Sequence, residues 1–213
     1  MTTIRSFSWC VAILTLCCGL MTAPTEAASI GSVTRIRGDA SAESSGQKRN
    51  LTKDAEIDMG DRLTTGPAAR LEIKFADGTT LTLGEKADFT IDDLTISKDS
   101  GIALFTRKAG AVLLSGGDIA KLPNHKIEIA SNAGTIGIRG TTVWGGTIKD
   151  KSQLDVFLIE GAVEVRSPGG TVVLDKPGLG TSIGTIGAKP DDPTQWQTAL
   201  RDRAVATVSF DAP

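Results

Sequence analysis

Few side chains in this sequence are placed to do catalytic chemistry. His125 is the only histidine, and it stands in LPNHKIEI just before an alternating apolar stretch, so we interpret it as a solvated turn residue. No Gly-x-Ser-x-Gly motif accompanies it. The three cysteines, Cys10, Cys17 and Cys18, all lie close to the N-terminus. A hydrolase built on a histidine-activated serine or cysteine is therefore poorly supported.

Carboxylates offer a second kind of chemistry, and the densest group is Asp88, Asp92 and Asp93 in ADFTIDDL. In a regular strand Asp92 and Asp93 would point to opposite faces, so they would not converge on one sugar as a glycosidase requires. The glycine-containing, ligand-rich loop of a calcium site is missing as well. We therefore predict no catalytic residues, no metal site and no cofactor.

Glycine-rich segments could hold phosphate, and two of them have suggestive spacing. Gly134, Gly137 and Gly140 recur every three residues, and GLGTSIG comes one residue away from a dinucleotide-binding pattern. Neither segment is followed by helical periodicity, so no helix N-terminus would be available for a phosphate. We interpret these glycines as sites of strand kinks and bulges.

Two residues of TIGIRGTTVWGGT remain as candidate binding residues, Arg139 and Trp144. In a strand, Arg139 and Gly137 share the face opposite Ile136 and Ile138. We expect the arginine to pair with a carboxylate or with turn carbonyls, Gly137 leaving room for the guanidinium, and we keep contact with a partner as the alternative. Trp144 is either core filler or a ligand platform.

The elements that would position these residues are strands. From Ile30 to Ile186 apolar and polar residues alternate between glycine-rich turns, most clearly in RLEIKFADGTTLTL, where Asp77-Gly78 predicts a hairpin turn. This rhythm predicts an all-β fold, either a multi-stranded β-sandwich or a β-helix-like stack. The polar segment 43–54 is expected to be an exposed loop. A short C-terminal α-helix is predicted over 193–206, laying Trp196 and Leu200 on the β domain.

The N-terminus has a different composition. Arg5, an apolar run from Phe7 to Ala23 and the small residues around Ala27 predict a signal peptide over 1–27, with a retained membrane anchor as the alternative. The β domain would then span 28–188 and a helical extension 189–213. Without residues 1–27 the chain has no cysteine. The net charge is −2, so nucleic acid and anionic membranes are not expected partners.

The sequence resembles the FecR domain in four segments, which occur in the order GDRLTTG, RLEIKFADGTTLTL, TIGIRGTTV and DVFLIEGAVEV. The resemblance covers about Ile30 to Ile186 and implies an all-β extracytoplasmic domain. In the best-known members this domain relays a signal from an outer-membrane receptor to a cytoplasmic anti-sigma segment. The motif positions that carry the resemblance, interpreted as structural, are Gly60, Asp61, Gly66, Asp77, Gly78, Gly137, Arg139, Gly140, Thr141, Glu160 and Gly161.

This sequence departs from that plan, because only six residues precede the apolar run and leave no room for an anti-sigma segment. We therefore expect a non-catalytic module of a bacterial envelope that senses a signal or binds a protein. It would be periplasmic or secreted, and we favour a Gram-negative source. Its partner would be another envelope protein, and no membrane span would remain after cleavage. A self-associating scaffold is the first alternative and a polysaccharide-acting enzyme the second. The ligand and the oligomeric state stay open.

Overall fold

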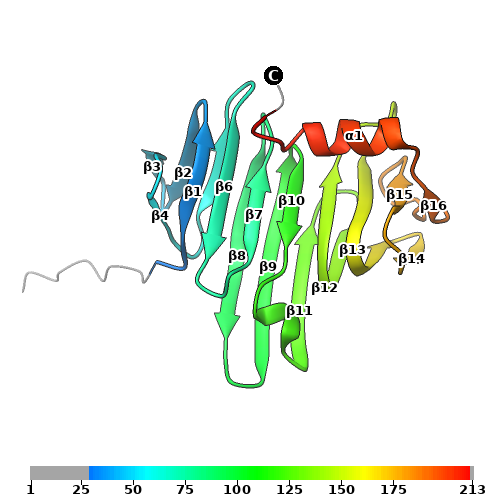
Figure 1. Cartoon of the computed structure of the whole chain (residues 1–213), viewed down its shortest axis with the longest axis horizontal. Coiled ribbons are helices and arrows are strands. Elements are labelled where there is room, and N and C mark those ends of the chain that lie inside the picture. The colour runs from blue at the N-terminus through cyan, green and yellow to red at the C-terminus, as the bar shows by residue number, and fades with distance from the viewer. Residues whose placement is uncertain (1–28, 212–213) are drawn as a thin grey trace, which may run out of the picture.

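The computed structural model describes residues 29–211, with the side chain of Thr141 left out, so the predicted signal peptide lies outside the described residues. The described part is mostly β-structure, as predicted, with one 3-10 turn and one α-helix (Figure 1). No helix in residues 29–211 is long and apolar enough to cross a membrane. The elements are β1 (Gly31–Arg37), β2 (Ala40–Ser44), β3 (Gln47–Asn50), β4 (Glu56–Ile57), β5 (Arg62–Thr65), β6 (Arg70–Phe75), β7 (Thr80–Leu83), β8 (Asp88–Ile96), β9 (Ser100–Ala109), β10 (Val112–Ser115), η1 (Ile119–Lys121), β11 (Asn124–Ala130), β12 (Thr135–Gly146), β13 (Leu154–Ser167), β14 (Gly170–Leu174), β15 (Leu179–Ile183), β16 (Thr194–Gln195) and α1 (Thr198–Ala206).

The strands described form one continuous, curled sheet. Its main path runs β3-β2-β5-β8-β9-β11-β12-β10-β7-β6-β1-β4, and β13 to β16 extend from β12. The pairings are antiparallel except that of β9 with β11. The curl brings two layers face to face: Phe75 of β6 lies 6.0 Å from Phe105 of β9, ring centre to ring centre. The predicted sandwich-like packing is therefore made by a single sheet folded over on itself.

The fold in the sheet is made by β12 and β13, which run through both layers. The first half of β12 pairs with β11 and the second half with β10, while β13 follows it along the other edge. Between the pairs Arg139–Ala162 and Thr142–Glu160 the register shifts, so two residues of β12 oppose one of β13. Gly140 and Gly161 fall in this bulge with φ of 64° and 81°. A bulge with glycine at positive φ bends and twists both strands, which turns the sheet.

Alternation of apolar and polar residues builds the core, as the sequence predicts. In β6, Leu71, Ile73 and Phe75 are buried while Lys74 is exposed. The predicted hairpin forms between β6 and β7, with Leu71 opposite Leu83 and Gly78 at φ 82°. Because the buried residues of both layers form one cluster, the layers share a single hydrophobic core.

The prediction of a loop over 43–54 is wrong. Residues 40–50 form the hairpin β2–β3, with Ser41 opposite Asn50 and a two-residue turn at Ser45 and Gly46. Both turn residues have positive φ, 51° and 77°, as a type I′ hairpin turn requires. The side chains of β3 are largely exposed, so the strand lacks the apolar alternation that would have indicated it.

The C-terminal helix exists but begins later than predicted. Residues 194–195 form β16, which pairs with β15 and carries the sheet past residue 188, and α1 starts only at Thr198. Trp196 therefore precedes the helix. It is buried against Phe157, with ring centres 5.1 Å apart, so the expected packing of Trp196 on the β domain is confirmed.

The segment after α1 is held on the sheet by arginines. Arg70 Nη2 donates to the carbonyl of Ala206 at 3.2 Å, and Arg37 Nη1 donates to the carbonyl of Phe210 at 2.9 Å. A cation is favourable at the C-terminal end of a helix. Burial lowers the pKa of Arg70, and the nearby charge of Arg37 lowers it further, opposed by Glu85. The chain end thereby covers one end of the folded sheet.

Candidate functional site

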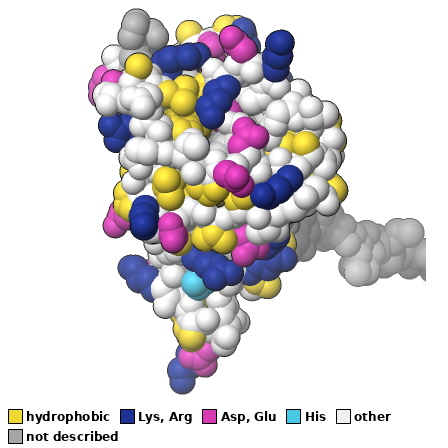
Figure 2. All heavy atoms as spheres, turned by 90° about the vertical axis from the view of Figure 1, so that its right-hand side faces the viewer, with side chains coloured by type: hydrophobic (Ala, Val, Ile, Leu, Met, Phe, Trp, Pro, Cys, Tyr) yellow, Lys and Arg dark blue, Asp and Glu magenta, His cyan; other side chains and the backbone are white. Residues whose placement is uncertain are grey.

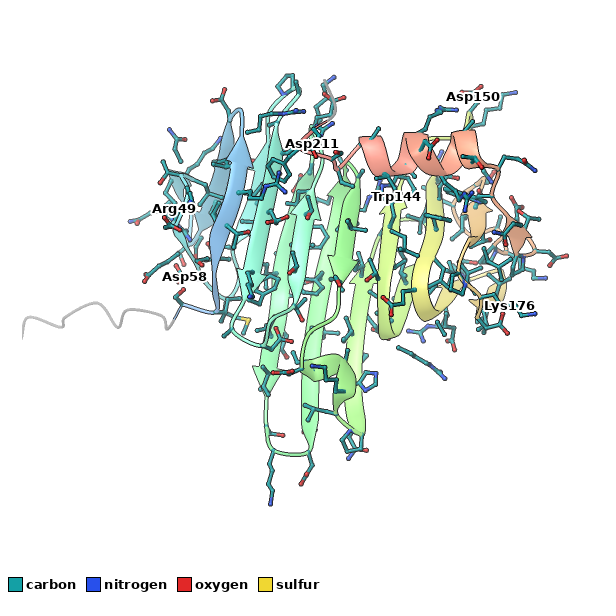
Figure 3. The ribbon with its side chains drawn as sticks, viewed as in Figure 1. Arg49, Asp58, Trp144, Asp150, Lys176 and Asp211 are labelled. Atoms are coloured by element: carbon teal, nitrogen blue, oxygen red, sulfur yellow. The ribbon has the colours of Figure 1, made fainter. Side chains whose placement is uncertain are left out.

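The residues of the first FecR-like motif are structural. Gly60 has φ 83°, and Asp61 is fully buried. The Asp61 carboxylate accepts hydrogen bonds from the backbone N–H of Asp58 at 2.9 Å and from Arg49 Nη1 at 2.8 Å. The hydrogen bond to Asp61 raises the pKa of Arg49. The pair ties β3 to the turn before β5, at the end of the sheet where Figure 3 shows Arg49 and Asp58.

Gly66 and Asp77 also organise turns. The Gly66 N–H donates to the carbonyl of Asp39 at 2.8 Å. The Asp77 carboxylate accepts from the Thr79 hydroxyl at 2.6 Å and from the Ile119 N–H at 3.3 Å, so the β6–β7 turn anchors η1. Asp77, Thr79 and Ile119 are buried, so these contacts belong to the scaffold of the fold.

A shallow depression of about 310 Å³ lies on the outer face of β11, β12 and β13. Its floor is Gly137, which stands in register between Glu128 of β11 and Glu164 of β13. Arg166 bridges the two carboxylates: its Nη1 lies 2.9 Å from Glu164 Oε1, and its Nη2 contacts Glu128 Oε1. A Cβ on Gly137 would lie 3.7 Å from Arg166 Nη1. This is an ordinary contact distance, so the space over position 137 does not require glycine, and the guanidinium that lies there is that of Arg166 and not that of Arg139.

Arg139 lies at the rim of this depression. It faces outward, opposite the buried Ile136 and Ile138, as predicted from the alternation. Its side chain is 73% exposed, and its Nη2 reaches Glu164 Oε2 at 3.4 Å. This contact is the expected carboxylate pairing, yet the guanidinium keeps most of its surface in solvent.

Opposite charges alternate across the depression. Lys126 Nζ lies 3.2 Å from Glu128 Oε2. Burial raises the pKa of Glu128, but hydrogen bonds from Arg166 and Lys126 outweigh it and hold the pKa below its ordinary value. Hydrogen bonds to Glu164 and Glu128 raise the pKa of Arg166. We call Lys126, Glu128, Gly137, Arg139, Glu164 and Arg166 the charged depression.

Sequence reasoning missed four of these residues: Lys126, Glu128, Glu164 and Arg166. KIEI and VEVRS do show charges on the polar face of each alternation. These charges come together only when β11, β12 and β13 pair side by side. The alternation within each segment does not indicate which strands are neighbours in the sheet.

Trp144 is fully buried beneath α1 (Figure 3). Its Nε1 donates to the Thr207 hydroxyl at 3.0 Å, and its ring packs edge-on against Trp196 at 6.1 Å. Val143 next to it belongs to the main core, so both faces of β12 are covered here. The interpretation of Trp144 as core filler fits this burial, and a ligand platform does not.

The acidic residues Asp92 and Asp93 of β8 accept hydrogen bonds from neighbouring threonines. A bulge between Ile91 and Asp93 puts Asp92 and Asp93 on the same outer face, so the expectation of opposite faces is wrong. The Thr106 hydroxyl donates to Asp92 at 2.8 Å, and that of Thr95 donates to Asp93 at 2.7 Å.

The other two candidate residues, Asp88 and His125, also contact neighbouring residues of the fold. Asp88 forms a two-point ion pair with Arg62, at 2.9 and 2.7 Å. His125 Nδ1 lies 2.6 Å from the carbonyl of Leu122. His125 is the second residue of β11, half-buried and paired with Gly101 of β9, so its interpretation as a solvated turn residue is wrong. Residues 29–211 contain no cluster of three or more metal-ligating side chains.

The remaining motif residues lie around the corner of the sheet. Thr142 and Glu160 are opposite each other, next to Gly140, Thr141 and Gly161. A smaller hollow of about 180 Å³ reaches this corner and includes Gly140 and Glu160. The FecR-like motifs thus describe the turns, the corner and one rim residue of the charged depression.

Comparison with known proteins agrees with this geometry. The family model described as FecR protein matches residues 61–164, which run from β5 into β13. A search of curated proteins found no match. Two crystal structures described as a "putative anti-sigma factor" from Parabacteroides distasonis superpose with TM-scores of 0.55 and 0.54 at 12% sequence identity, which shows a shared fold. Each superposition covers 68% of this chain and 64% of the solved chain, so this chain accounts for less than two thirds of those structures. Residues 61–164 of this chain are a FecR domain.

Proposed function

We propose that this chain is an exported, non-catalytic protein-binding module that takes part in signal transduction in a bacterial envelope. The observation that carries the proposal is the FecR domain, whose strands β11 to β13 display the charged depression on an otherwise structural scaffold. The fold shared with chains described as an anti-sigma factor supports a protein partner. The composition of residues 1–27 supports export to the periplasm or the medium.

The charged depression suits a polar, transient protein interface. Charges of both signs with fixed geometry select a partner with the complementary pattern and speed the encounter. Arg139 is the most exposed cation of the charged depression, with 73% of its side chain exposed against 56% for Lys126 and 42% for Arg166. Arginine is common among residues that dominate binding energy. We assign Arg139 the role of partner contact.

Site-specific photo-crosslinking tests this assignment in the intact envelope. A photo-reactive residue at Lys126 should capture one defined envelope protein, identified by mass spectrometry. The same residue at Lys74, exposed on β6 of the other layer, is the matched control and should not capture it. Equal capture from both positions would contradict the docking site.

A charge reversal completes the test. Arg139→Glu should reduce the adduct formed from position 126 by roughly tenfold, as expected for loss of a desolvated charge contact. The variant should keep its fold, because Arg139 makes one long contact from an exposed position. An unchanged adduct yield in Arg139→Glu would remove Arg139 from the interface.

Self-association is a second candidate, supported by the sheet edge at β14. Among the strands of residues 29–211, this one pairs with β13 alone, and Val173 on it is 51% exposed. Figure 2 faces this end of the molecule, where hydrophobic side chains lie among charged ones. An unpaired edge can add a strand from another copy. Light scattering decides: Val173→Lys should abolish concentration-dependent assembly, and a monomer at all concentrations would exclude this candidate.

A further inference from the structure

Arg107 occupies an unusual place in the sheet. Along β9 the inward positions are Ala103, Phe105 and Arg107, and the first two belong to the hydrophobic core. Arg107 continues this series and is only 4% exposed. Burying a guanidinium is unfavourable unless hydrogen bonds and an opposite charge compensate for the lost hydration.

The compensation that the protein provides is incomplete. Arg107 Nε donates to the carbonyl of Gly110 at 2.7 Å, and Nη2 donates weakly to the Thr147 hydroxyl at 3.3 Å. Arg49, Arg62, Arg139 and Arg166 all lie within 4.0 Å of a carboxylate, whereas Arg107 forms no ion pair with any described residue. Burial lowers the pKa of Arg107, and the charge of Asp155 opposes this only from beyond ion-pair distance.

Arg107 lines a pocket of about 380 Å³ at the end of the folded sheet. The surrounding wall includes Lys108, Asn132, Thr147 and Gln153, and Thr207 of the C-terminal segment closes one side. Within the described part of the chain, the side-chain amides of Asn132 and Gln153 make no hydrogen bond and can donate to a ligand. The volume is that of a small-molecule site.

One wall of this pocket is built rigidly. Asp155 is fully buried, and its Oδ2 accepts hydrogen bonds from the N–H groups of Ile148 and Lys149, at 2.8 and 2.9 Å, and from the Ser152 hydroxyl at 2.7 Å. These bonds fix the loop that carries Thr147 and Gln153. A pocket with a preformed wall loses little entropy when a ligand binds.

We propose that this pocket is a binding site for a small oxyanion, a carboxylate or phosphate group, held by the guanidinium of Arg107. The planar fork of arginine matches both groups in a two-point contact. Lys108 adds positive charge at the rim. Glu85, also at the rim, accepts a hydrogen bond from the Ala68 N–H at 2.8 Å. Its negative charge opposes the binding of an anion and so favours ligands of low negative charge. This site is on a different part of the sheet from the charged depression, and its test is independent of the proposed partner.

Thermal unfolding of the full chain tests the site. Sodium phosphate, sulfate and acetate are compared with sodium chloride at equal ionic strength. We expect at least one oxyanion to raise Tm saturably, by about 3 °C or more at ten times its Kd. Arg107→Met should lose the saturable rise, and in chloride alone it should melt at or above the wild-type temperature, because an uncompensated buried charge is gone. Lys98→Gln, a cation removed from the exposed β8–β9 turn, is the control and should keep the rise.

A second variant keeps the proposal testable if Arg107→Met does not fold. Glu85→Gln removes the rim charge and should tighten the binding of the same anion by about two- to fivefold. Backbone NMR shifts on titration should concentrate at Gly110, Thr147 and Gln153. A linear, non-saturable rise in Tm shared by Arg107→Met, or shifts centred elsewhere, would overturn the proposal.

Discussion

Gly180 in β15 lies directly against the indole ring of Trp196. A Cβ at position 180 would come within 2.3 Å of Trp196 Cε2 and Nε1. Trp196 in turn stacks on Phe157 and meets Trp144, and these rings with Ala204 and Val208 form a second hydrophobic cluster. The indole ring of Trp196 therefore packs on β15 at a position where only glycine leaves enough space, and this packing attaches the C-terminal segment to the sheet.

Gly180→Ala should displace the Trp196 ring and lower the free energy of unfolding by about 1–3 kcal/mol, the usual cost of overpacking. Chemical denaturation measures this loss, and near-UV circular dichroism should report the disturbed tryptophans. Gly184→Ala is the matched control, because a Cβ there meets no atom within 4 Å. Equal stability of the two variants would show that the ring contact does not hold the segment.

The corner of the sheet depends on two glycines at positive φ. Gly140→Ala and Gly161→Ala should each cost about 1–2 kcal/mol, since L-residues are strained at φ of 64° and 81°. Gly137→Ala, on the same strand, would place its Cβ at ordinary contact distances of 3.6 Å and more. Urea unfolding curves for the three variants should therefore rank Gly137→Ala as the mildest, and the reverse order would exclude a role for backbone conformation.

Within the charged depression, Arg166 and Arg139 should differ in their effect on stability. Arg166→Lys loses the fork that joins Glu128 and Glu164 and should lower stability by about 1 kcal/mol. Arg139→Lys should change it by less than about 0.5 kcal/mol, as is usual for an exposed single contact. Melting curves at low salt compare the two variants. A larger loss of stability in Arg139→Lys than in Arg166→Lys would show that Arg139, and not Arg166, is the structural arginine.

Acid should destabilise the protein partly through Asp88. The hydrogen bond from Arg62 lowers the pKa of Asp88, more than burial raises it. A carboxylate whose pKa is lower in the folded state stabilises the fold above its unfolded pKa, near 3.8, and this stabilisation is lost as pH falls through the folded pKa. The difference in Tm between the wild type and Asp88→Asn should stay constant from pH 7 to pH 5 and shrink below pH 4. A difference independent of pH down to pH 2 would contradict the linkage.

The sequence by itself determined the fold class, the main hairpin and the face of each strand. Leu71, Ile73 and Phe75 alternate with polar residues, and Asp77-Gly78 supplies a turn that few other pairs can make, so these features are local and readable. The same holds for Arg139, whose outward direction follows from the burial of Ile136 and Ile138. Failures of the local pattern occurred where a bulge shifts the alternation, as at Asp92 and Asp93, or where a strand is exposed on both faces, as in β3.

Only the tertiary structure decided which residues meet. Strand register placed Gly137 between Glu128 and Glu164 and brought Arg166, distant in sequence, over it. Packing of the C-terminal segment covered the outer face of β12 and buried Trp144, and the end of the folded sheet enclosed Arg107. Pairing of strands far apart in the chain is set by the combined free energy of the whole core, and no short stretch of sequence records it.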